Sequence, residues 1–278
     1  MNRVVLLFFV SVPLLCNVSY ADKGDGVIDP GENETDELAR AVQNPIASLI
    51  SLPFQTNTDF NYGPQDKTQS VTNIQPVWPV ELNEDWNLIT RTIVPVVTQP
   101  ELIPGQGRKT GLGDTTFTAF LSPRDSGAWI WGVGPAVLIP TNTDDRLGAD
   151  EWGAGPSFVV LTMPGRWVVG SLFSNVWDIN GDEDINFFTW QPFVNYNMEK
   201  GWYLTAAPIV TANWEGESGE KWTVPVGGGL GRIFRVGSQP MNVNFQYFYN
   251  LEKPEKPIET TSNWTVRFQF QFMFPKSR

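Results

Sequence analysis

The chain has 278 residues, a formal net charge of −11, one cysteine and no histidine. An acidic chain without a basic stripe repels nucleic acid, so we exclude DNA and RNA as partners. Without histidine, Ser-His and Cys-His nucleophilic chemistry is also excluded. We expect neither a metal nor a cofactor.

The N-terminus has the layout of a secretory signal peptide. Arg3 supplies a positive charge, and 4–16 form an apolar run. Ser19 and Ala21 are small residues at the positions that signal peptidase reads, so cleavage is expected after Ala21. The run is too short for a membrane-spanning helix, which needs about 20 apolar residues. The protein is therefore expected to be exported.

A lipoprotein is the alternative, with Cys16 acylated. Pro13 and the bulky Leu15 stand where small and apolar residues would be required, which argues against it. Cleavage after Ala21 removes the cysteine and leaves 18 basic and 30 acidic side chains. A disulfide framework and a thiolate metal site are then excluded.

The end of the chain alternates strictly between apolar and mostly polar residues, which predicts a β-strand with two different faces. A half-buried strand of a soluble sandwich would give the same pattern. A phenylalanine-rich terminal strand is also typical of the signal that outer-membrane barrels present to their assembly machinery, and we favour that interpretation. The apolar face comprises Val266, Phe268, Phe270, Phe272 and Phe274, and the other face comprises Arg267, Gln269, Gln271 and Met273.

No segment after the signal peptide is apolar enough for a membrane-spanning helix, so a membrane span must be built from strands. We predict an all-β fold, a closed antiparallel transmembrane barrel of about twelve strands over 46–274, followed by a short tail at 275–278. An even strand number suits a closed barrel. The predicted strands are 46–55, 69–80, 86–98, 113–122, 129–140, 152–163, 167–177, 185–197, 202–214, 221–232, 241–250 and 263–274.

The connections alternate between short and long. If both termini are periplasmic, all five short turns fall on the periplasmic side and six longer loops, including 56–68, fall outside. Tryptophans gather at the strand ends, as expected for two interfacial belts, although a soluble core could also take up tryptophan. One belt comprises Trp86, Trp129, Trp167 and Trp202, and the other comprises Trp152, Trp177, Trp214, Trp222 and Trp264.

Several prolines fall inside predicted strands, where each removes a ladder hydrogen bond. They mark either bulges or strands that are broken in two. They are Pro76, Pro95, Pro135, Pro156, Pro192, Pro208 and Pro225.

Alternation also assigns candidates to the barrel interior, which we expect to be small and neutral-polar. An arginine facing lipid near mid-membrane would cost about 2–4 kcal/mol, so both Arg91 and Arg267 are expected to point inward. They either contact a solute, or are paired or solvated near a strand end. The other candidates for the interior are Thr205, Thr211, Asn213, Gln269 and Gln271.

Two acidic segments have oxygen ligands at spacings that calcium accepts, namely 178–184 and 25–32. Both lack parts of a full calcium loop, so ordinary solvated loops are the preferred interpretation. Between the signal peptide and the barrel, 22–45 is an acidic segment in which Asp36 caps a short helix that ends before Asn44-Pro45. This helix either hangs in the periplasm or enters the barrel as a plug.

Several segments resemble the bacterial outer-membrane barrel family named for the meta-pathway of phenol degradation, over about residues 38–274. The resemblance implies a barrel that transports small, often aromatic or apolar compounds, and it brings no established binding residues. The segments that carry it are 44–55, 73–76, 85–91, 111–114, 131–135 and 224–229.

Three functions are compatible with these observations. The first is a passive channel for small molecules in the outer membrane of a Gram-negative bacterium. The second is a structural or adhesive barrel whose loops bind a partner. The third, a membrane-embedded lipid hydrolase, is disfavoured because the acidic residues lie in loops rather than on facing strands. We expect no enzyme activity; the expected partners are the lipid bilayer, the assembly machinery and a small solute.

Overall fold

The computed structural model describes residues 30–179, 185–255 and 261–275. The expected signal peptide, most of both calcium-like segments and residues 276–278 of the predicted tail lie outside this part. Its elements are α1 (Pro30–Gln43), β1 (Ile50–Tyr62), β2 (Lys67–Ile74), β3 (Val77–Glu81), β4 (Trp86–Gln99), β5 (Lys109–Leu112), β6 (Thr115–Pro123), β7 (Trp129–Ile139), β8 (Gly153–Thr162), β9 (Trp167–Asp178), β10 (Asn186–Asn197), the 3-10 turn η1 (Glu199–Gly201), β11 (Trp202–Ala206), β12 (Val210–Asn213), β13 (Trp222–Val236), β14 (Gln239–Glu252) and β15 (Trp264–Phe274).

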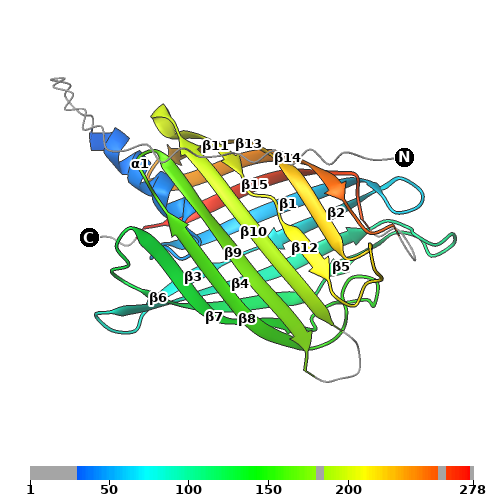
Figure 1. Cartoon of the computed structure of the whole chain (residues 1–278). Coiled ribbons are helices and arrows are strands. Elements are labelled where there is room, and N and C mark those ends of the chain that lie inside the picture. The colour runs from blue at the N-terminus through cyan, green and yellow to red at the C-terminus, as the bar shows by residue number, and fades with distance from the viewer. Residues whose placement is uncertain (1–29, 180–184, 256–260, 276–278) are drawn as a thin grey trace, which may run out of the picture.

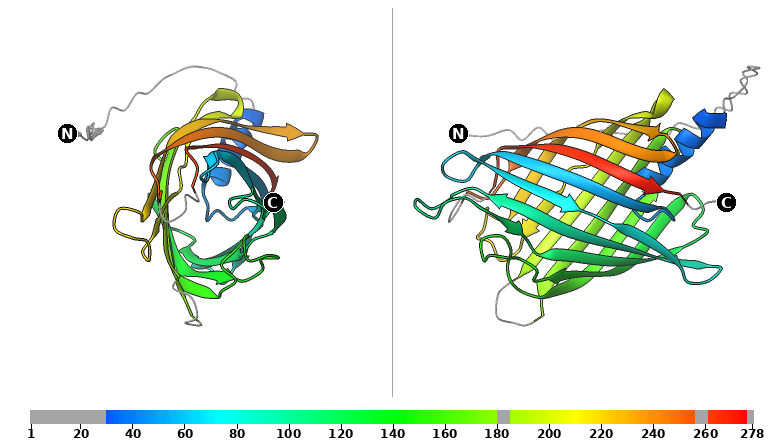
Figure 2. Two further views of the ribbon diagram at one scale, coloured as in Figure 1. Left: turned by 90° about the vertical axis from the view of Figure 1, so that its right-hand side faces the viewer. Right: turned by 180° about the vertical axis from the view of Figure 1, so that it is seen from behind.

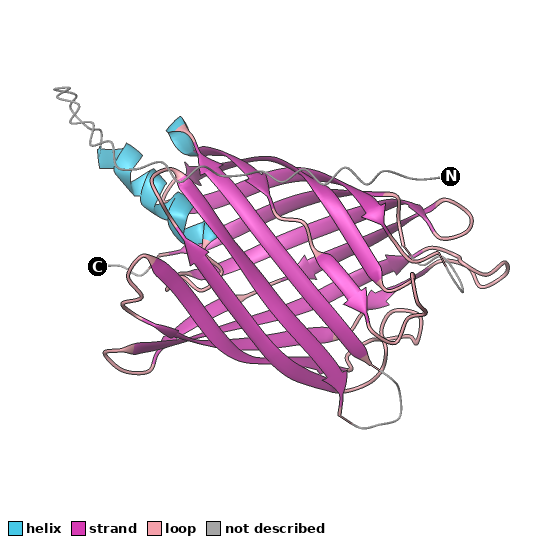
Figure 3. Cartoon of the chain, in the orientation of Figure 1, coloured by secondary structure: helices cyan, strands magenta, loops and turns pink. Residues whose placement is uncertain are grey.

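These fifteen described strands form one antiparallel sheet that closes into a barrel (Figures 1 and 3). Three wall strands are interrupted: β2 and β3 both pair with β1 and β4, β5 and β6 both pair with β4, and β11 and β12 both pair with β10 and β13. Fifteen segments minus three therefore give twelve wall strands. The predicted twelve-strand barrel is confirmed.

The barrel closes where its first and last strands pair. Ile50 lies opposite Phe274 and Phe60 lies opposite Trp264, so β1 pairs with β15 over eleven residue pairs. Closure removes both sheet edges, so each wall strand has a neighbour for its backbone hydrogen bonds on either side. The start of β1 and the end of β15 thus share one end of the barrel with α1 (Figure 1).

The first strand corrects the sequence prediction. We expected a strand at 46–55 and a loop at 56–68, but β1 runs from Ile50 to Tyr62 and turns into β2 within 63–66. Ile46 and Leu49 are buried inside the mouth of the barrel instead of lying in the wall. The polar stretch after residue 55 is strand because its backbone pairs with β15 on one side and β2 on the other.

The prolines mark breaks as well as bulges. Pro76 lies between β2 and β3, and Pro208 lies between β11 and β12, so the predicted strands 69–80 and 202–214 are each broken in two. Pro225 lies at a register shift between β13 and β14. Pro95, Pro135, Pro156 and Pro192 stay within β4, β7, β8 and β10.

The outward face of the wall is apolar. Phe158, Leu204, Leu230, Phe245 and Phe268 are all exposed on it, each with at least 40% of its surface accessible. Water cannot cover such a continuous apolar surface without cost, whereas lipid tails can. None of the helices in the described ranges is long and apolar enough to cross a membrane.

The nine tryptophans of the predicted belts lie at strand ends. One group follows the short turns, at the first residues of strands, and the other borders the longer connections. In the first group Trp86, Trp129, Trp167 and Trp202 begin β4, β7, β9 and β11; in the second, Trp222 and Trp264 begin β13 and β15, Trp177 is near the end of β9, and Trp152 and Trp214 flank β8 and β12.

Helix α1 is seated in the mouth of the barrel at the end of the short turns. Leu38 and Ala39 are buried against Tyr203, Ile233 and Met273, all from the barrel wall. Figure 2 (left), which looks into the barrel from the other end, shows the blue helix within the outline of the strands. The helix ends at Gln43, before Asn44-Pro45 as expected, but it begins at Pro30 and not near Asp36.

The close approach of β6 to β7 allows the packing of the barrel wall to be tested. A β-carbon on Gly134 would overlap the backbone oxygen of Ala119. We expect Gly134→Ala to lower the free energy of unfolding by about 1–3 kcal/mol, because the strands must separate to make room. The midpoint of thermal unfolding in detergent measures this, with Val133→Ala on the outward face as control. Equal midpoints for Gly134→Ala and the wild type would contradict the predicted overlap.

Candidate functional site

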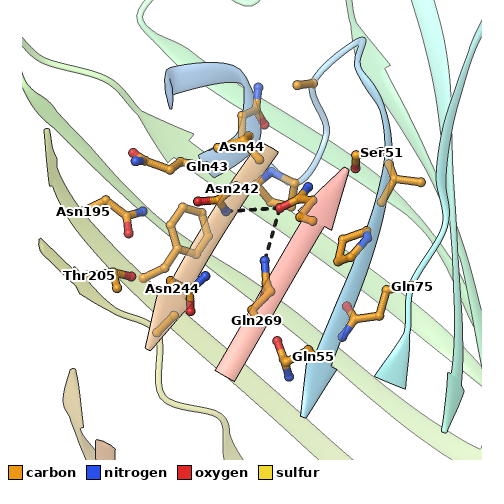
Figure 4. A pocket seen from close by; sticks show the side chains of 18 of the residues that line it. Gln43, Asn44, Ser51, Gln55, Gln75, Asn195, Thr205, Asn242, Asn244 and Gln269 are labelled. Atoms are coloured by element: carbon orange, nitrogen blue, oxygen red, sulfur yellow. Dashed lines mark hydrogen bonds between the residues drawn. The ribbon is translucent and has the colours of Figure 1, made fainter. Parts of the chain in front are cut away.

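A cavity of about 170 Å³ lies inside the barrel, next to the end of α1 (Figure 4). The residues that close it at the helix side are Gln43, Asn44 and Pro45. The rest of its lining comes mainly from β1, β3, β4, β9, β10, β11, β14 and β15. An apolar cavity of about 150 Å³ can hold a benzene molecule, so this space admits a molecule with one small ring.

One half of the cavity wall is built of amide side chains in rows. Asn244 on β14 lies beside Gln269 on β15, which lies beside Gln55 on β1. The neighbouring row pairs Asn242 with Gln271. Because successive side chains of a strand alternate between faces, the sequence of β15 places Gln269 and Gln271 inward while its phenylalanines face outward.

The amides hold one another by hydrogen bonds. The Tyr203 hydroxyl donates to Asn242 Oδ1 at 2.7 Å, and Asn242 Nδ2 donates to Gln271 Oε1 at 3.3 Å. Gln269 Nε2 donates to the same Gln271 oxygen at 3.2 Å. Figure 4 shows the bonds from Asn242 and Gln269 side by side. The network fixes these amides in one arrangement, so the cavity has a defined polar wall before any solute enters.

The other half of the interior is apolar, which the sequence analysis did not predict. Ile89, Phe120, Val159, Val168 and Phe193 form a buried cluster with Leu161, Leu172 and Ile46. Phe193 and Leu172 also line the cavity. The expected neutral-polar interior therefore also contains an apolar cluster, and Leu172 and Phe193 add an apolar patch to the cavity wall beside the amides of Gln191 and Asn195.

Two arginines reach the cavity from different strands, Arg91 on β4 and Arg267 on β15. Arg267 is 4% exposed; its Nε donates to Asn57 Oδ1 at 2.8 Å and its Nη1 to the Ala207 oxygen at 2.7 Å. Its guanidinium also lies over the Phe248 ring, 4.8 Å from the centroid. Arg91 donates to Gln75 Oε1.

Polar contacts fasten the helix that closes this cavity. Arg40 donates to the backbone oxygens of Gly165 and Met163, at 2.5 and 2.6 Å, in the turn between β8 and β9. The amides of Gln43 and Asn197 bond reciprocally, at 2.8 and 3.2 Å. The end of α1 is thus tied to the turn between β8 and β9 and to the last residue of β10, as well as packed against the wall of the barrel.

The structure brings most of the predicted interior residues together. Arg91, Thr205, Arg267, Gln269 and Gln271 all line the cavity. Thr211 and Asn213 are not among its lining; they pair with Thr189 and Phe187 on β10, farther toward the long loops. Sequence reasoning missed the amides of β14 and the helix end, although Asn242, Asn244 and Gln246 alternate with apolar residues as the amides of β15 do.

Ion pairs hold two of the loops at the end of the barrel opposite α1. Asp144 pairs with Lys109 at 2.6 Å and with Arg146 at 2.8 Å, and these partners hold its pKa far below the ordinary value. Hydrogen bonds from Lys67 and from the backbone of Gly105 and Gly107 lower the pKa of Glu101. Both carboxylates therefore stay charged over the whole physiological range. The described residues contain no group of three or more side chains placed to hold a metal ion.

The fold is that of a known outer-membrane channel. The chain is 16% identical to the COG4313 outer membrane channel from Pseudomonas putida F1, with a TM-score of 0.65, over 83% of this chain and 97% of that one. The CymD monoaromatic hydrocarbon channel (8% identity, TM-score 0.46, 90% and 94% covered) and outer membrane phospholipase A from Escherichia coli (12%, 0.41, 82% and 97%) are too distant in structure to support an inference.

Comparison with curated protein sequences gives no match. A family model does match, over residues 53–268, and its description is "Putative MetA-pathway of phenol degradation". This match spans more than three quarters of the chain and includes most of the strands that form the cavity. The chain belongs to this family of phenol-degradation barrel proteins, as its sequence motifs indicate.

Proposed function

We propose that the protein is a channel for the passive uptake of small molecules across the outer membrane of a Gram-negative bacterium. The observation that carries the proposal is a closed barrel with an apolar outer wall around a cavity lined by preformed polar groups. Only helices and closed barrels span a bilayer, and an apolar exterior requires lipid around it. The polar side chains that line the cavity are not needed to pack a core, so they are suited to contact a solute.

The shape and chemistry of the cavity support a small solute with an apolar part. Leu172 and Phe193 offer an apolar side, while the amide rows offer hydrogen bonds to polar groups on the same molecule. The name of the family points in the same direction, toward aromatic compounds. The solute class is therefore a small molecule, aromatic or otherwise apolar over part of its surface.

The orientation follows from the connections and the termini. The short turns, α1 and the end of β15 share one barrel end, which is periplasmic in outer-membrane barrels. The tryptophans at the strand ends then lie near the two interfaces of the bilayer. The phenylalanine face of β15 serves as the signal for the assembly machinery.

Helix α1 is the constriction that a solute must pass on the periplasmic side. It is tied by side-chain hydrogen bonds of Arg40 and Gln43, and it packs through the buried Leu38 and Ala39 and the partly buried Ala41 and Val42. These contacts are few enough for the helix to leave the mouth of the barrel without unfolding of the wall.

Purified mature protein in a planar bilayer tests the proposal. We expect discrete conductance steps in simple salt solutions, because water and ions enter a polar-lined barrel. Swelling of liposomes in a small neutral sugar gives an independent measurement. A folded barrel that produces neither conductance nor swelling would rule out a passive channel.

Replacing Leu38 by aspartate tests the role of the helix. The new carboxylate would be buried without a partner, at a cost of several kcal/mol, so the helix should leave its seat. We expect a larger single-channel conductance than in the wild type. Glu37→Ala, at an exposed neighbouring position, is the matched control and should leave the conductance unchanged. If both variants conduct like the wild type, the helix is not the constriction.

A further inference from the structure

The charged side chains that line the cavity indicate a class of ligand. The channel proposal alone does not name that class. Of the described residues that line the cavity, two are charged, and both are arginines, Arg91 and Arg267. Both side chains line the same cavity of about 170 Å³, so their like charges share one small space. Two like charges in a partly dehydrated space are costly unless an anion neutralises them.

The protein itself supplies little of that neutralisation. No carboxylate in the described ranges lies within 4 Å of either guanidinium. Asp59 on β1 is not among the residues that line the cavity, and it accepts hydrogen bonds from Thr265 and Ser262. The charged groups that line the cavity are therefore both positive.

The arginines also keep donors that the wall does not use. A guanidinium has five N–H donors in a fixed fork. Described hydrogen bonds account for two donors of Arg267, to Asn57 and Ala207, and for one of Arg91, to Gln75. The fork matches a carboxylate, which accepts two parallel hydrogen bonds.

We propose that the cavity binds a small monocarboxylate with an apolar body, its carboxylate at Arg91 and Arg267 and its apolar part against Leu172 and Phe193. The volume of about 170 Å³ matches a body of one ring or a short chain, which chloride would leave empty. The proposal rests on the proposed channel function and names the substrate class of its cavity.

The two arginines are not equivalent. Arg267 is held by the Ala207 oxygen and the Phe248 ring, so its removal would leave a backbone acceptor unpaired and disturb the break between β11 and β12. Arg91 has a single described side-chain hydrogen bond, to Gln75, and is the better position for a substitution. Arg232 offers a matched control, because it lies on the outer wall over the Trp202 ring, 5.0 Å from its centroid.

Calorimetric titration of the detergent-solubilised protein with sodium benzoate tests the proposal. We expect saturable binding to one site, and binding at least about tenfold weaker for benzamide, which has the same ring but no charge. Arg91→Gln should weaken benzoate binding by a similar factor, whereas Arg232→Gln should not. Equal affinities for benzoate and benzamide in the wild type would overturn the proposal, whether or not Arg91→Gln folds.

Further measurements distinguish a carboxylate site from a general anion site. They also separate the proposed carboxylate site from the proposed passive channel. Sodium phosphate or chloride binding as tightly as benzoate would replace the carboxylate site by a general anion site. A barrel that conducts but does not prefer benzoate over benzamide overturns the carboxylate site alone. A barrel that binds benzoate with the expected preference but passes no ions or solutes overturns the passive channel alone.

Discussion

The constraint on which the structure depends is that lipid offers no partner for a backbone hydrogen bond. Every strand of the wall must therefore pair on both sides, and β1 meets β15 to complete the ring. Closure gives each strand one lipid face and one interior face, so a period of two in the sequence becomes a division between outside and inside. Phe268 and Gln269 are neighbours in the chain, yet one faces outward and the other lines the cavity.

The prolines fit this constraint because they lie where the ladder is already interrupted or shifted. At the break between β11 and β12 the chain leaves the wall for three residues, 207–209. The oxygen of Ala207 then accepts from Arg267 and its N–H donates to Gln246, so side chains of β14 and β15 satisfy the backbone that the sheet releases. A defect of the wall thereby positions one of the two interior arginines.

The sequence was sufficient for features that depend on local alternation. In β15 the contrast between phenylalanine and glutamine is large, so faces and the inward Arg267 could be predicted. In β8, Val159, Val160 and Leu161 are all apolar, so alternation could not reveal that one face builds an interior cluster. The seat of α1 could not be predicted at all, since Leu38 meets Tyr203 and Ile233 only after the barrel has closed.

The charge that lines the cavity has the opposite sign to the net charge of the chain. Acidic residues predominate over the whole chain, yet the charged groups lining the cavity are positive. In the loops Asp144 and Glu101 are already paired with Lys109, Arg146 and Lys67, which weakens the field they present to an approaching anion. The interior arginines act at short range in a medium with little screening. A single organic anion that reaches the cavity is therefore governed by the two guanidiniums and not by the net charge of the chain.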